Sequence, residues 1–221
     1  CMTMRSKQNE PLSSLTHFVG MLLAIAGLVI LVVYAALQSS TWHITTFSIF
    51  GASLVLLYFA SSLYHFISRE NRFKDSLQKI DQGMIFILIA GTYTPVALIP
   101  LRGAWGWSLF GIIWGLAIVG ILLKIFLSDR LPRWVLPVLY LAMGWLAVIA
   151  LNPLAQALPA MGLFWLILGG IFYTVGVVYF ALERFVPRAQ WLGMHEIFHL
   201  FVIAGSASHF WLMYKYILAI E

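Results

Sequence analysis

The chain has 221 residues, of which 62% are hydrophobic and only 10% are charged. A water-soluble domain is about 45–50% apolar and about 25% charged, so this composition excludes a soluble globule and predicts an integral membrane protein. One cysteine excludes an intrachain disulfide and a cysteine-built metal site. The net charge of +5 is typical of basic loops beside membrane spans, and we expect no nucleic-acid partner.

Seven apolar segments follow one another, each close to the roughly 20 residues that a membrane-spanning helix needs. They cover residues 15–37, 45–67, 83–101, 105–127, 133–151, 161–182 and 194–218. Polar stretches separate them, among them the charged run 68–80 and the pair Asn152-Pro153. We therefore expect an all-α, seven-transmembrane helix bundle that forms a single membrane domain over 1–221, with a short tail at 1–13.

The basic residues predict the orientation of this bundle. Of the 13 lysines and arginines, only Arg102 and Lys215 fall on one side of the membrane, and the other eleven fall on the opposite side. The eleven are Arg5, Lys7, Arg69, Arg72, Lys74, Lys79, Lys124, Arg130, Arg133, Arg184 and Arg188. Because cytoplasmic loops carry an excess of Lys and Arg, we expect the N-terminus in the cytoplasm and the C-terminus outside.

Polar and ionisable residues inside spanning helices are costly and are functional candidates by default. Four groups of them stand out, and the predicted orientation places all four at the cytoplasmic level of the membrane. They are Ser61 and His65 near the end of the second helix, Asp81 just before the third, His195 and His199 at the start of the seventh, and Glu10, Ser14 and His17 around the start of the first.

Three histidines are enough for a catalytic zinc, which keeps a fourth coordination position for water. His195 and His199 are four residues apart and share a helix face, where His65 could join them. Zinc makes hydroxide available near neutral pH, and Asp81 could hold or deprotonate the water. Ser61 could orient His65 or the water. Asp81 could instead cap the third helix, and Ser61 could simply pack helices together.

The run His195-Glu196-Ile197-Phe198-His199 also fits H-E-x-x-H, the zinc metalloprotease helix in which the glutamate is the general base. An intramembrane metalloprotease is therefore an alternative. Two features weigh against it. No acidic residue follows until Glu221, and the motif lies in the last helix, which leaves no downstream core for a third ligand.

The order of these motifs along the helices resembles that of the bacterial hemolysin III proteins, which belong with the progestin and adiponectin receptor family. More distantly, it resembles the alkaline ceramidase group of membrane hydrolases. Four stretches carry the likeness, which extends from Ser14 to Tyr216: F-A-S-S-L-Y-H (59–65), A-G-T-Y-T-P (90–95), Y-L-A-M-G-W (140–145) and G-S-A-S-H-F (205–210).

This resemblance implies that His65, His195 and His199 are zinc ligands, that Asp81 acts on the water at the zinc and that Ser61 supports the site. It implies that Glu196 is incidental. The lead hypothesis is a zinc-dependent hydrolase of lipid amides or esters in a bacterial plasma membrane. The alternatives are a non-enzymatic membrane homeostasis or sensor protein with a structural zinc, and a lytic pore.

The expected partners are membrane lipids and a zinc ion. A soluble hormone ligand is not expected, because only about fourteen residues precede the first helix, whereas the eukaryotic receptors carry a sizeable cytoplasmic domain there. The substrate and the oligomeric state are not predicted by the sequence.

Overall fold

The computed structural model of the protein describes residues 11–38, 40–68, 70–128, 130–132, 134–182 and 193–220. These residues are helical with no strand among them, and seven helical segments are long and apolar enough to cross a membrane, as predicted. The first four are α1 (Pro11–Gln38), α2 (Thr41–Phe66), α3 (Lys74–Leu98) and α4 (Ala104–Phe126). The last three are the continuous segment α5 (Val135–Gly144), η1 (Trp145–Ala150) and α6 (Leu151–Ala157), then α7 (Ala160–Leu182), then α8 (Met194–Leu212) with η2 (Met213–Ile217).

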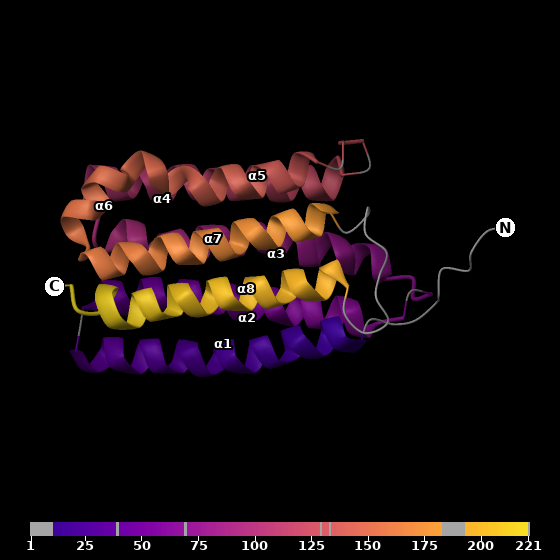
Figure 1. Cartoon of the computed structure of the whole chain (residues 1–221), viewed down its shortest axis with the longest axis horizontal. Helices are drawn as coiled ribbons and strands as arrows, with labels where there is room; N and C mark the ends of the chain where they lie inside the picture. Colours follow the sequence, from indigo (N-terminus) through magenta and orange to yellow (C-terminus); the bar gives the residue numbers. More distant parts are fainter. Residues whose placement is uncertain are drawn as a thin grey trace.

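The spans lie side by side in one bundle (Figure 1). Consecutive helices from α1 to α4 pack on one another, α7 packs on α8, and α8 also packs on α1. The last span is thereby brought against the first. The beginnings of α1, α3 and α8 and the end of α2 all lie at one end of the bundle, which we call the N-terminal end (Figure 1).

Helix α1 shows how the chain is adapted to lipid. Its buried face carries small residues such as Gly20, Ala24 and Gly27, while large apolar side chains such as Leu23 and Val29 are exposed. Small residues let helices approach closely, and lipid accepts large apolar side chains that water would not. The interior of the bundle also contains buried Ser, Thr and His side chains beside its apolar core.

The third span begins earlier than predicted. Helix α3 starts at Lys74, nine residues before the expected position 83, because the hydropathy pattern marks only the part of the helix inside the apolar layer. Asp81 therefore lies two turns inside α3, and the N-cap position belongs to Phe73. The alternative in which Asp81 caps this helix is wrong.

The predicted break at Asn152-Pro153 is also wrong, because both residues lie within α6. Pro153 is the third residue of α6 and so lies in its first turn, where proline is tolerated. The real irregularity comes earlier, where α5 gives way to the 3-10 turn η1. There the Tyr93 hydroxyl of α3 donates to the Gly144 carbonyl and accepts from the Ala147 N–H, both at 2.8 Å.

Helices α7 and α8 approach closely through glycines. A Cβ atom at Gly169 would lie 2.3 Å from Nε2 of His209, and one at Gly205 would lie 2.7 Å from the Tyr173 ring. His209 Nε2 lies 3.2 Å from the Leu166 carbonyl, to which it donates. His209 is thus a buried polar contact between α7 and α8.

Candidate metal centre

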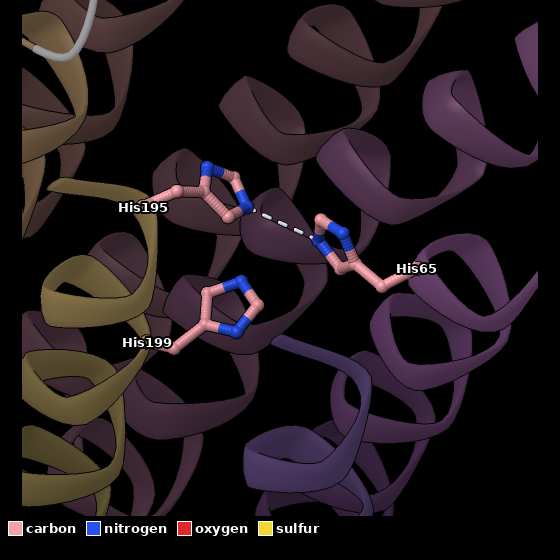
Figure 2. A group of neighbouring side chains, drawn as sticks. All are labelled: His65, His195 and His199. Atoms are coloured by element: carbon pink, nitrogen blue, oxygen red, sulfur yellow. Dashed lines mark hydrogen bonds between the residues drawn. The ribbon is translucent and has the colours of Figure 1, made fainter. Parts of the chain in front are cut away.

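Three histidines meet at the N-terminal end of the bundle (Figure 2). His65 comes from the last turn of α2, and His195 and His199 come from the first turns of α8. One ligand nitrogen from each lies within 4.8 Å of the others, and the Nε2 atoms of His65 and His195 are 3.1 Å apart. His65 and His199 are buried, and His195 is partly exposed. The predicted convergence of α2 and α8 on one site is therefore present.

This group could hold a metal ion, and the spacing of one pair of its nitrogens is close to that of zinc ligands. Zinc binds imidazole nitrogen at about 2.0–2.1 Å, so two ligands of a tetrahedral site lie about 3.3 Å apart. The 3.1 Å between His65 and His195 is close to that value. Within the described part of the chain, these three residues are the group of His, Cys or carboxylate side chains that could hold an ion. Three imidazoles suit zinc and other first-row transition metals.

Hydrogen bonds from α1 orient the third histidine. Nδ1 of His199 lies 3.2 Å from the Ser13 carbonyl and 3.4 Å from the Thr16 hydroxyl. A carbonyl oxygen can only accept, so this contact favours the tautomer with the proton on Nδ1. Nε2 is then left with its lone pair available. Metal-binding histidines usually donate their second ring nitrogen to an outer partner in this way.

Glu196 has a different role from the histidines on either side of it. Its carboxylate accepts from the Ser13 hydroxyl at 3.1 Å and from the Gly193 N–H at 2.9 Å, and the side chain is buried. It therefore caps the N-terminus of α8 and links that turn to α1 by a hydrogen bond. The carboxylate is not part of the three-histidine group. This arrangement gives the metalloprotease alternative no support.

Asp81 reaches the site from α3. The Ser61 hydroxyl hydrogen-bonds its carboxylate, which lies close enough to interact electrostatically with His65, His195 and Lys124. Ser61 thus contacts Asp81, whereas the sequence suggested that it would orient His65 or a water. Asp81 stands beside the three histidines without belonging to the group that can share one ion.

Lys124 is a neighbour of the site that the sequence reading missed. It lies in the last turn of α4, is only 8% exposed and interacts electrostatically with Asp81. In the sequence it is one of the eleven basic residues that predict the cytoplasmic side of the membrane. The sequence does contain a signal for its burial, because apolar residues lie on both sides of it in Leu-Leu-Lys-Ile-Phe. A lysine inside such a helix needs a polar or charged partner.

The polar residues predicted around the start of the first helix divide into three cases. Ser14 forms a reciprocal pair with Ser62, each hydroxyl donating to the other's carbonyl at 3.0–3.1 Å, which joins α1 to α2. His17 is stacked on His199, with ring centroids 3.5 Å apart. Glu10 lies outside the described residues.

Seven spans with three converging histidines and an adjacent carboxylate at one end define a helical membrane protein with a candidate metal centre. Comparison with known families matches residues 5–210 to the family described as Haemolysin-III related. The chain belongs to this family, as its motifs predicted, and is a multi-pass protein of a bacterial membrane.

Similarity to individual proteins extends over almost the whole chain. It is 42% identical to Hemolysin-3 homolog of Bacillus subtilis (strain 168) over 212 residues, which cover 95% of this chain and 94% of that protein. It is 38% identical to Hemolysin-3 of Bacillus cereus over 211 residues, covering 96% and 93%. It is 27% identical to human (Homo sapiens) Monocyte to macrophage differentiation factor over 185 residues, covering 82% and 74%.

Proposed function

We propose that the chain is a zinc-dependent hydrolase that cleaves an amide or ester bond in a membrane lipid. One observation carries the proposal: three histidine nitrogens can meet at one ion, and the carboxylate of Asp81 lies beside two of those histidines. Three protein ligands leave a fourth coordination position, which is typical of catalytic rather than structural zinc. Zinc in such a site supplies a Lewis acid that activates water near neutral pH.

The residues around the ion site have separate roles in this proposal. His65, His195 and His199 hold it, with His199 fixed in one tautomer by its bond to the Ser13 carbonyl. Asp81 accepts the proton of the attacking water, as a general base must lie within reach of the proton it removes. The Ser61 hydroxyl holds that carboxylate in place, and Lys124 balances its charge.

The depth of the site favours a lipid substrate. His65 is the next-to-last residue of α2, and His195 is the second residue of α8. Both residues also lie at the edges of apolar segments, 45–67 and 194–218, and the edge of such a segment lies where the hydrocarbon layer meets the polar headgroups. The ester and amide linkages of lipids lie at this same boundary, so a substrate could reach the site without leaving the membrane.

The test is turnover by the zinc-loaded protein in vesicles that contain ceramides or ester-linked acyl lipids, with free fatty acid as the readout. Asp81→Asn is the matched variant, because it removes the base and leaves the three ligands. We expect fatty acid release by the native protein and at least about a hundredfold slower release by the variant. A fully zinc-loaded protein that turns over none of these lipids would refute the hydrolase.

A structural zinc in a homeostasis or sensor protein is the second candidate. The observation that favours it is that the three ligands join α2 to α8 in a largely buried position. In that case Asp81→Asn would leave every function intact, while His65→Ala would abolish folding at ordinary temperature.

The lytic pore is the other alternative that the sequence left open. Leakage of dye from vesicles that contain the protein would test it. Variants of the metal site should not affect leakage through a pore.

A further inference from the structure

His17 is the fourth histidine of the N-terminal end, and the proposed chemistry does not use it. Its ring is stacked on that of His199, with centroids 3.5 Å apart and planes 13° from parallel. Its edge contacts the ring of Tyr58 at 5.1 Å and 78°. The side chain is 3% exposed and interacts electrostatically with His65 and His195 as well. His17 therefore belongs to the same cluster as the three candidate ligands.

Both ring nitrogens of His17 are buried and make no hydrogen bond of normal geometry among the residues that the structure describes, although the backbone of His199 lies close enough to interact with the ring. Leaving a buried donor or acceptor unpaired destabilises the folded protein, and an apolar ring at this position would avoid that loss. Buried unsatisfied groups in native proteins commonly mark a functional site or a bound partner. Packing alone therefore does not account for a histidine here.

His17 is stacked on one of the three candidate ligands but is not a member of the group whose nitrogens could share one ion. We therefore do not count it as a fourth ligand. Its ring lies beside the cluster, where it could hydrogen-bond a non-protein group held at the site.

We propose that His17 is a substrate-positioning residue of the metal centre, whose imidazole hydrogen-bonds the oxygen-bearing group at the coordination position that the three histidines leave open. The inference rests on the proposed metal site and adds a binding partner for the acyl group. A neutral imidazole carries one donor and one acceptor, so it can donate to a carbonyl oxygen or accept from an N–H or O–H group.

The test uses the full-length protein loaded with Co²⁺, whose visible spectrum reports its coordination, and acetohydroxamate as a probe of the open position. His17→Phe keeps an aromatic ring against His199 and removes both nitrogens, while His17→Gln keeps a hydrogen-bonding group. His43→Phe is the control, because His43 is also a buried histidine but lies about 33 Å away at the other end of α2.

We expect His17→Phe to bind one Co²⁺ with an unchanged spectrum and an unchanged or higher Tm, but to bind acetohydroxamate about tenfold more weakly, the loss expected for one hydrogen bond. His17→Gln should lose less, and His43→Phe should bind the probe like the native protein. The inference fails if His17→Phe binds the probe normally, loses Co²⁺ or loses stability. If the native protein itself binds no metal or no probe, the proposed function fails and this inference fails with it.

Discussion

The Nε2 atoms of His65 and His195 lie 3.1 Å apart, although 130 positions separate the two residues in the chain. Two ring nitrogens at this distance need either a shared proton or a shared cation between them. His199 adds a third nitrogen, and α1 supplies the contacts that orient it. The first, second and last spans must all be in place before the site exists.

Removing one ligand should remove the metal. We expect His65→Ala to weaken zinc binding by at least about a hundredfold, because two histidines from one helix turn remain. Zinc should raise the Tm of the native protein, since a ligand at 100 times its Kd stabilises by about 2.7 kcal/mol, and should not raise that of the variant. Competition with a chelator measures the affinity. Equal zinc affinity in both proteins would exclude His65 as a ligand.

Lys124 and Asp81 should be coupled in stability. We expect Lys124→Met to cost about 3 kcal/mol, because a buried carboxylate loses its balancing charge. Adding Asp81→Asn to that variant should recover much of the loss, since neither charge then remains. Unfolding of the two single variants and the double variant measures the coupling. Strictly additive losses would show that the two side chains do not act on one another.

Glu196→Gln distinguishes a helix cap from a catalytic base. The charged acceptor of the Ser13 hydroxyl and the Gly193 N–H would be lost, so we expect a destabilisation of about 1–2 kcal/mol. Zinc content and the lipid hydrolysis of the folded protein should persist. Loss of hydrolysis at an unchanged Tm would favour the metalloprotease type of chemistry instead.

The sequence predicted the seven spans and the meeting of His65, His195 and His199, because hydropathy and the 3.6-residue period are local signals. It did not reveal the partner of Lys124, since a long basic side chain near a helix end can extend toward water or toward a neighbour, and only packing against α3 decides between them. The early start of α3 was missed for a related reason. Its first turns are polar, and hydropathy does not report a helix that continues into water.

Two adjacent glycines of α7 should respond oppositely to the same substitution. Gly169→Ala would place a Cβ 2.3 Å from His209, so we expect it to lower the free energy of unfolding by about 1–3 kcal/mol. Gly170 has open space at this position, and Gly170→Ala should be neutral or stabilising by up to about 1 kcal/mol. Thermal unfolding compares them. Equal effects would mean that α7 and α8 do not pack as described.

The most direct test of the central claim is a crystal structure of the zinc-loaded protein with an anomalous difference map at the zinc edge. We expect one peak at the N-terminal end of the bundle, about 2.0–2.1 Å from a nitrogen of each of His65, His195 and His199. A non-protein group should complete the coordination, with Asp81 beside it. A peak elsewhere, no peak, or a site closed by a fourth protein ligand would contradict the account.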